Sequence, residues 1–449
     1  MALLLLTAAA ILAASHLIID LRSGQESPYP LTDPSRIQPS DLADFPSPAV
    51  GIRFFQGRLR QNPEDFVSLT LLGQLYLQEA RQTGDVASYG RAETALLEAL
   101  RILPGYPAAK AALASAHYAT HDFIGALELA EELYQLNPRR TDLLAIIADA
   151  HLSLGHYEQA APIYQALLER KSSPSILARL AHQAELHGNP EQALELMQRA
   201  AGEALFNNVA KEEMAWYLIR LGDLHFNAGE IRAAEQHYRA ALRLYPDYAL
   251  ALADVGKARA ALGRLEEAIE FYRRATEIIP QPEQLAALGD LYTIQGEQAL
   301  AQRQYDTVVF IGNLAEINRQ VYNRQLANFY SDHDLQPEQA LKLALSELEV
   351  RKDVFGYDAA AWAYFKNGQL DQAQRMIDIA MKLGTRDAKL YYHAGMIAFG
   401  RGDPAAAERL LSEAIAINPF FDTLQARIAR SVLAGLSPDS PATILRRPR

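Results

Sequence analysis

Apolar residues recur at intervals of three and four along most of the chain, from about residue 49 to residue 436. This spacing places them on one face of a helix and predicts a series of amphipathic α-helices. A longer pattern is superimposed on it, in which an alanine is followed four residues later by a bulky side chain and seven later by a small or apolar one. Its alanines are 34, 34, 33, 41, 34, 33, 39, 33 and 34 residues apart, at Ala92, Ala126, Ala160, Ala193, Ala234, Ala268, Ala301, Ala340, Ala373 and Ala407. An interval of about 34 residues accommodates two short helices and a turn, so the sequence predicts about ten helical hairpins.

Each repeating unit has small residues where two helices would cross. In one clear unit, Gly222 and Ala234 are the small residues and Tyr238 is the bulky one, while Gly229 and Pro246 stand at the ends of the two helices. Small residues allow two antiparallel helices to approach closely, and the bulky residue fills the groove between neighbouring units. Glycine is typical of a helix end and proline of a break between helices. The 41-residue interval is about two helical turns longer than the others, so it predicts longer helices that keep the same inward face.

These units resemble the tetratricopeptide repeat family, whose 34-residue helix–turn–helix signature they match. The turn glycines that carry the resemblance best are Gly229, Gly263, Gly296, Gly368 and Gly402. The resemblance implies an all-α fold, a right-handed α-solenoid superhelix of about ten units over residues 49–436, with a capping helix over residues 420–436. Residues 50–63 are expected to form the second helix of an incomplete leading unit. In this family the first helices line a hollow concave wall that binds an extended peptide or a helix of a protein partner.

Two stretches depart from the regular repeat. The turn of the first unit, over residues 82–90, is about seven residues longer than the others, and a turn glycine is missing within residues 312–334. The interval between repeats also lengthens in the second stretch. The hairpin pattern is therefore expected to be least regular at these two places.

The two ends of the chain differ in composition from the repeats. Residues 1–21 are mostly apolar and include the small residues Ala13, Ala14 and Ser15, so they predict a signal peptide or an N-terminal membrane anchor. Six prolines make residues 22–48 an extended Pro-rich linker, and residues 437–449 are expected to be a disordered basic tail. Export or anchoring places the repeats outside the cytoplasm. The alternative, in which the N-terminal segment is a buried helix, leaves the protein in the cytoplasm.

Composition and motifs argue against several classes of function. The formal net charge of −11 makes nucleic acid an improbable partner, because nucleic-acid binding depends on neutralising phosphates. The absence of cysteine excludes disulfides and thiolate metal sites, and it suits an oxidising compartment. His117 and His121 have the spacing of metal ligands, but His117 stands where the family places a packing residue, and no third ligand is evident. With neither a phosphate-binding loop nor a serine-elbow motif, the sequence predicts no catalytic residue, no metal and no cofactor.

The first helices supply the candidate partner-binding residues. Setting the units in register assigns these side chains to the concave wall: Trp216, Asp223, Phe226, Arg324, Asn328, Phe355, Trp362, Phe365, Lys389, Tyr392 and Phe399. They include both tryptophans of the chain, and an aromatic wall suits an apolar or extended peptide. The alternative is that these aromatic residues pack between the helices.

Four polar residues partly match a carboxylate clamp known in the family. Arg324 and Asn328 stand where the first of three consecutive units has a basic residue and asparagine, and Lys389 and His393 stand where the third has two basic residues. The middle unit has Ala359 where asparagine is expected. The resemblance thus implies a partial clamp for the C-terminal carboxylate of a partner, held by charge-assisted hydrogen bonds. A solvated charged face is the alternative interpretation.

The sequence predicts a non-catalytic scaffold or adaptor that binds a peptide or a partner segment in the concave groove. Two other functions stay open. One is an extracytoplasmic receptor for a small ligand or glycan, which would use C-terminal aromatics such as Trp362. The other is an accessory subunit of an enzyme complex whose catalytic site lies on another chain.

Overall fold

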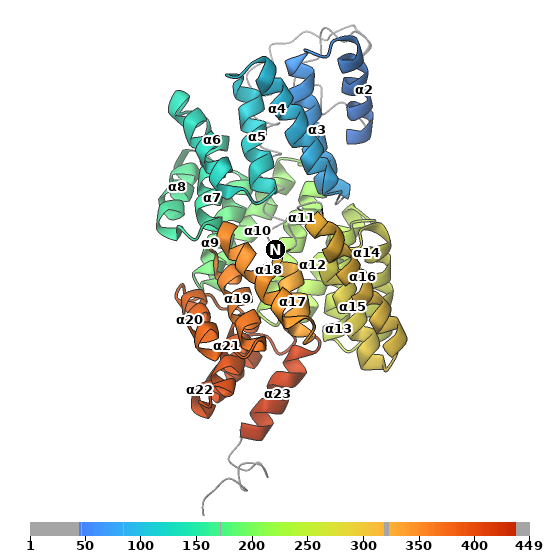
Figure 1. The fold of residues 1–449 in the computed structure, drawn as a ribbon, viewed down its shortest axis with the longest axis vertical. Helices are drawn as coiled ribbons and strands as arrows, with labels where there is room; N and C mark the ends of the chain where they lie inside the picture. Colours follow the sequence, from blue (N-terminus) through green and yellow to red (C-terminus); the bar gives the residue numbers. More distant parts are fainter. Residues whose placement is uncertain (1–44, 46, 84, 171, 318–322, 437–449) are drawn as a thin grey trace, which may run out of the picture. The chain divides into compact units, whose positions relative to one another are not determined.

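The computed structural model describes residues 45, 47–83, 85–170, 172–317 and 323–436, and Figure 1 shows its helices. Within these ranges the chain is all-α, and no residue lies in a β-strand. The helices form two compact units that divide between Lys171 and Ser172. Each unit is a stack of helix pairs, which confirms the predicted helical solenoid. The predicted N-terminal segment of residues 1–21, nearly all of the linker and the C-terminal tail lie outside the described residues.

The first unit contains seven described helices. They are α2 (Pro48–Gln61), α3 (Phe66–Thr83), α4 (Ala87–Ile102), α5 (Pro107–Ala119), α6 (Phe123–Leu136), α7 (Thr141–Ser153) and α8 (Tyr157–Arg170). Helices α3 to α8 pack as three consecutive hairpins, and α2 packs on α3 as the second helix of a preceding pair would.

The second unit contains fifteen described helices. They are α9 (Pro174–Leu186), α10 (Pro190–Phe206), α11 (Lys211–Asn227), α12 (Ile231–Leu244), α13 (Ala249–Ala261), α14 (Leu265–Ile278), α15 (Pro282–Gln295), α16 (Gln298–Ile317), α17 (Asn323–Asp332), α18 (Pro337–Val350), α19 (Val354–Lys366), α20 (Leu370–Met381), α21 (Ala388–Gly400), α22 (Pro404–Ile417) and α23 (Gln425–Leu436). Helices α9 to α22 pack as seven hairpins, and α23 lies against α22 at the end of the stack.

The described residues therefore contain ten hairpins, the number that the sequence predicts. The longest interval between repeats also has the predicted cause. Helices α10 and α11 each have 17 residues, whereas α12 and α13 have 14 and 13. The extra residues lengthen both helices by about one turn each instead of forming a loop.

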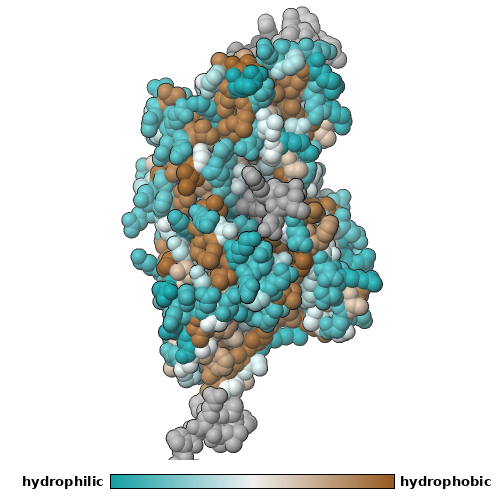
Figure 2. Space-filling model, viewed as in Figure 1, coloured by the Kyte–Doolittle hydropathy of each residue, from teal (hydrophilic) through white to brown (hydrophobic). Residues whose placement is uncertain are grey.

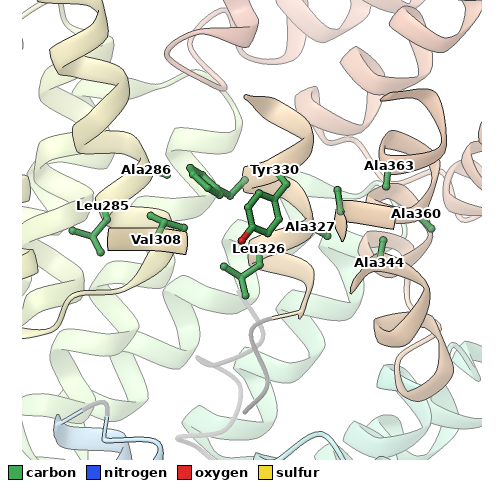
Figure 3. Packing of buried hydrophobic residues seen from close by; sticks show 11 residues of the cluster. Leu285, Ala286, Val308, Leu326, Ala327, Tyr330, Ala344, Ala360 and Ala363 are labelled. Atoms are coloured by element: carbon green, nitrogen blue, oxygen red, sulfur yellow. The ribbon is translucent and has the colours of Figure 1, made fainter. Parts of the chain in front are cut away.

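Close helix crossings explain the small residues of the repeat. A Cβ atom added to Gly256 of α13 would lie 2.9 Å from the ring of Tyr272 on α14, which is closer than side chains normally approach. Figure 3 shows a buried core that continues from hairpin to hairpin, in which Val308 of α16, Leu326 and Tyr330 of α17 and Ala360 of α19 belong to one cluster. Each hairpin therefore buries its apolar faces against its neighbours, as stacked repeats require.

The turns within hairpins use a left-handed residue. The predicted turn glycines all have positive φ angles, for example +77° at Gly229 and +70° at Gly368. Where the glycine is absent, His121 with φ of 66° and Asp334 with φ of 54° take the left-handed position. Aspartate tolerates this conformation better than most residues, so the missing turn glycine leaves the hairpin of α17 and α18 intact.

None of the helices in the described ranges combines the length and the apolar composition needed to cross a bilayer.

Candidate functional site

The first helices of the second unit, which we call the inner wall, carry charged side chains that pair with one another from hairpin to hairpin. Arg220 of α11 binds Asp223 at 2.9 Å and reaches back to Glu185 of α9 at 3.3 Å. Lys257 of α13 lies 3.0 Å from Asp254 and 3.6 Å from Asp223. The buried charges of this wall are therefore paired with opposite charges from the same or a neighbouring hairpin.

Burial and these contacts shift the pKa values of carboxyl groups in the inner wall. Burial opposes ionisation of Glu185, but the hydrogen bond from His182 and the charge of Arg220 outweigh it and hold the pKa of Glu185 at about 2. Burial raises the pKa of Asp254 to about 6, with help from the charge of Asp223. The two carboxyl groups differ because Glu185 receives several hydrogen bonds, whereas one oxygen of Asp254 is buried with no hydrogen bond.

The inner wall is tightly curved near the C-terminal end. Lys389 of α21 binds Asp332 of α17 at 2.7 Å, so first helices two hairpins apart touch directly. The side chain of Gln425, the first residue of α23, accepts a hydrogen bond from Tyr392 at 2.6 Å and donates one to the carbonyl of Asp332 at 3.0 Å. The start of α23 thus occupies the inner wall here, which corrects the expectation of a wall that is hollow along its whole length.

An aromatic cluster fills the space behind these contacts. Trp362 is fully buried, stacks on Phe365 and His393 with ring centroids 5.0 and 4.3 Å away, and donates from Nε1 to Asp332 at 2.8 Å. Tyr392 is also buried against it. These rings form the core between α19, α21 and α23.

The second unit also closes on itself along a seam between two rims. One rim consists of the turns within its first three hairpins, residues 187–189, 227–230 and 262–264. The other consists of the loops before α21 and α23, residues 382–387 and 418–424. Thr385 donates from Oγ1 to the carbonyl of Leu186, and Asn418 donates from Nδ2 to the carbonyl of Phe226 at 2.8 Å. These contacts join residues 199 and 192 positions apart in the sequence.

Close backbone packing at the seam excludes side chains. A Cβ atom on Gly188 would clash with the carbonyl oxygen of Gly384, and one on Gly229 would lie 3.5 Å from Pro419. Thr385 and Asn418 are 3% and 2% exposed, so the seam contacts exclude solvent. The last carbonyls of a helix lack partners within the helix. Thr385 supplies a hydrogen bond to the carbonyl of Leu186, and the carbonyl of Phe226 accepts one from Asn418 in addition to one from the backbone N–H of Gly229.

At the third turn the two rims separate and leave a cleft of about 230 Å³, which we call the seam cleft. Its lining combines apolar side chains with three basic residues, one carboxylate and one hydroxyl, and consists of Phe226, Lys257, Ala260, Ala261, Gly263, Leu265, Pro419, Phe420, Phe421, Asp422, Thr423, Ala426, Arg427 and Arg430. Phe420 is 41% exposed although it is a large apolar residue. Figure 2 shows further hydrophobic surface toward the lower end of the second unit, in the region of α23.

The comparison with protein families agrees with this architecture. A tetratricopeptide repeat model matches residues 147–208, 219–281 and 359–420, and each match covers consecutive helices of the stack. The chain contains tetratricopeptide repeats. The repeats of this family generally serve as protein-interaction scaffolds, and the matches do not distinguish a subfamily.

Solved structures of other repeat proteins resemble the chain at low identity. IFIT1 with Gppp-AAAA is 16% identical over 74% of this chain and 76% of that one, with a TM-score of 0.48. Cut9 in the APC/C hetero-tetramer Cut9–Hcn1 is 17% identical over 86% and 81%, with a TM-score of 0.38. Yeast Tom70 is 14% identical over 85% and 99%, with a TM-score of 0.32. A search of curated proteins found none that matches. At these TM-scores and identities, no role or partner of these proteins carries over to this chain.

Half of the candidate partner-binding residues that the sequence suggests are buried within the tetratricopeptide repeats. Trp216, Phe226, Arg324, Trp362, Tyr392 and His393 are each at most 8% exposed. Asp223, Asn328, Phe355, Phe365 and Lys389 are partly buried, and Phe399 is 45% exposed. Packing between helices, the alternative stated for the aromatic residues, is what the structure shows for both tryptophans and Tyr392. Their contact with a partner stays a prediction that would require the inner wall to open.

The basic residues of the partial carboxylate clamp already have internal partners. Arg324 lies 3.4 Å from Asp353, Lys389 lies 2.7 Å from Asp332, and His393 lies 2.8 Å from Asp358. Asn328 has its carbonyl oxygen buried with no hydrogen bond. A carboxylate from a partner would have to displace these internal carboxylates, so the geometry favours a structural role for the cations.

Sequence reasoning missed the seam and most of the cleft. Phe420 is the residue that could have indicated the cleft, because the corresponding loop positions of other units hold polar residues such as Arg139 and Asp247. An exposed aromatic residue at a position that is elsewhere polar suggests contact with something outside the repeat. The seam itself has no such signal, since its acceptors are backbone carbonyls.

The histidines with metal-ligand spacing have structural neighbours. His117 pairs with Asp122, and His121 stacks on Phe123 with ring centroids 5.5 Å apart. In the part of the chain that the structure describes, no group of three or more ligating side chains is arranged to hold a metal ion.

Proposed function

We propose that the protein is a non-catalytic scaffold whose second unit binds a segment of a protein partner in the seam cleft. The observation that supports this is the cleft itself, where apolar side chains and unneutralised cations share one concave surface. The neighbouring inner wall, by contrast, is filled by charges and rings that already pair within the chain. An apolar concave surface with a few directing polar groups is the usual form of a binding site.

The charges of the cleft favour a partner segment that carries carboxylates. Arg427 and Arg430 lie one turn apart on the exposed side of α23. Among the described residues Arg427 forms no ion pair, and Arg430 donates only to the carbonyl of Pro419. Lys257 is already held by Asp223 and Asp254, so the two arginines carry the free positive charge. Arginine binds carboxylates with two parallel hydrogen bonds, which gives direction as well as affinity.

The apolar part of the cleft favours an aromatic or aliphatic side chain next to the carboxylate. Phe226, Leu265 and Phe421 supply this surface, and the exposed ring of Phe420 stands among them. Burying such a ring on binding would contribute affinity without new polar contacts. The proposed partner segment is therefore short, acidic and partly apolar.

The buried ionisable groups support a scaffold and not a catalyst. Glu185, Asp332 and Lys389, whose pKa values are shifted, pair with side chains on neighbouring helices. Lys257, which lines the cleft and has a raised pKa, pairs with Asp223 of α11 in the same way. Their role in the structure is to hold consecutive hairpins together.

We further propose that the scaffold works outside the cytoplasm. Two features of the sequence support this location: the apolar N-terminal segment of residues 1–21 and the complete absence of cysteine.

Selection from a library of short random peptides tests the proposed site. The full chain should enrich peptides in which Asp or Glu neighbours Phe, Leu or Trp. Phe420→Ala should weaken their binding by about tenfold, since it removes the main exposed ring of the cleft. Phe310→Ala, which removes a ring that is 60% exposed on α16 outside the cleft, should leave binding unchanged. Equal loss in both variants, or no enrichment at all, would contradict the proposal.

A further inference from the structure

The seam cleft has walls from two places far apart in the sequence. One wall comes from α13, α14 and the turn between them, and the other from the loop before α23 and the start of that helix. The two rims touch at the first turn, through Thr385 and Leu186, and at the second, through Asn418 and Phe226. At the third turn the two rims form opposite walls of the cleft. The cleft therefore exists only while the seam is closed.

Few contacts hold the seam compared with those that hold each hairpin. The cross-seam hydrogen bonds of Thr385 and Asn418 reach carbonyls at the ends of α9 and α11, and the backbones of Gly188 and Gly384 lie against each other. Neighbouring hairpins, in contrast, bury large clusters such as the one around Tyr238 and Val255. A contact made of a few polar groups can open at a much lower free energy than the hairpins can unfold.

We propose that closure of the seam and occupation of the seam cleft are coupled, so that the partner segment acts as a latch across the two rims. The inference rests on the proposed function and adds its regulation. A segment that touches Leu265 on one rim and Arg427 on the other gains both sets of contacts only in the closed state. Such a ligand shifts the population toward that state, and closure raises the affinity by the same factor.

The residues of both rims explain why an acidic segment suits this role. Phe420 and Arg427 belong to the rim of α23, and the turn before Leu265 belongs to the rim of α13 and α14. Arg427 offers a partner for a carboxylate on one rim, and Leu265 offers apolar surface on the other. A segment that is both acidic and apolar would therefore contact both rims, and opening the seam would separate the two halves of its site.

Thr385→Val tests the coupling without touching the cleft. The substitution keeps the shape of the side chain but removes the hydroxyl that donates to Leu186, so a buried carbonyl loses its partner and the seam opens more often. Hydrogen exchange on the full chain should then become about tenfold faster not only at residues 186–189 but also at residues 260–265 and 419–424, which line the cleft. Thr70→Val, in which a buried threonine loses a bond to the carbonyl of Phe66 in the first unit, should change exchange at neither place.

Binding of a defined probe gives the second readout. A fluorescein-labelled synthetic peptide of alternating Glu and Phe should bind the Thr385→Val variant several-fold more weakly than the unchanged chain, and bind the Thr70→Val variant normally. If exchange and binding at the cleft do not respond to Thr385→Val, the rims move independently and the coupling is wrong, although the scaffold proposal stands. If the probe fails to bind the unchanged chain, the proposed acidic partner is wrong, and the exchange experiment still decides the coupling.

Discussion

Replacing Gly188 with alanine is expected to destabilise the second unit by about 3 kcal/mol. Gly188 has a φ angle of +72°, a conformation that costs an alanine about 1 kcal/mol or more. The new Cβ would also clash with the carbonyl of Gly384, which lies across the seam and cannot move without breaking the contact. Urea denaturation followed by tryptophan fluorescence measures the effect directly, because both tryptophans, Trp216 and Trp362, lie in the second unit.

Gly368→Ala is the matched control for this result. Gly368 occupies the same turn position in the hairpin of α19 and α20, with φ of +70°, but a Cβ atom there would meet nothing within 4 Å. Gly368→Ala should lower the free energy of unfolding only by the cost of placing alanine in the left-handed conformation, about 1 kcal/mol. The difference between the two variants measures the seam, and equal losses would mean that the seam contributes nothing to stability.

Trp362→Ala is expected to cost about 3 to 5 kcal/mol, the usual range for deleting a large buried ring. The substitution would leave a cavity between Phe365 and His393 and remove the hydrogen bond to Asp332. Asp332 would retain Lys389 as a partner, so the loss should come mainly from packing. Trp216 remains as the fluorescent reporter for denaturation in the same unit.

Phe399→Ala distinguishes a core residue from a surface residue within the same group of candidates. The sequence assigns both Trp362 and Phe399 to the concave wall, but Phe399 is 45% exposed while Trp362 is fully buried. Truncating Phe399 should therefore cost less than about 1 kcal/mol. If the two substitutions destabilise the unit equally, the burial of the aromatic cluster is not as described.

The hairpins could be predicted from the sequence because the information about them is local. Alanine and glycine at fixed intervals indicate where two helices cross closely, as the contact of Gly256 with Tyr272 shows. A glycine such as Gly229 indicates a left-handed turn. The lengths of α10 and α11 follow from the longest interval between repeats. Because these features repeat, an irregular unit can still be recognised by comparison with the neighbouring units.

The seam and the filling of the inner wall could not be predicted because they depend on curvature. A small change in the angle between successive hairpins decides whether a stack of seven remains open or meets itself. The sequence at the seam contains no pattern that predicts these contacts, because the hydrogen-bond acceptors are the backbone carbonyls of Leu186 and Phe226. The same curvature buries Trp362 and Tyr392, which a more open superhelix would leave on the concave surface.

Closure of the second unit on itself is tested most directly by the distance between spin labels at positions 189 and 386. Asn189 makes no capping hydrogen bond with its side chain, Arg386 is half exposed, and the chain has no cysteine of its own to interfere with labelling at Asn189→Cys and Arg386→Cys. A Cβ atom on the neighbouring Gly188 would lie 3.6 Å from the side chain of Arg386. A closed second unit should give a single short distance between the two labels. An open stack would separate the labels by six hairpins, on the order of 50 Å, and a distance of that size would contradict the account.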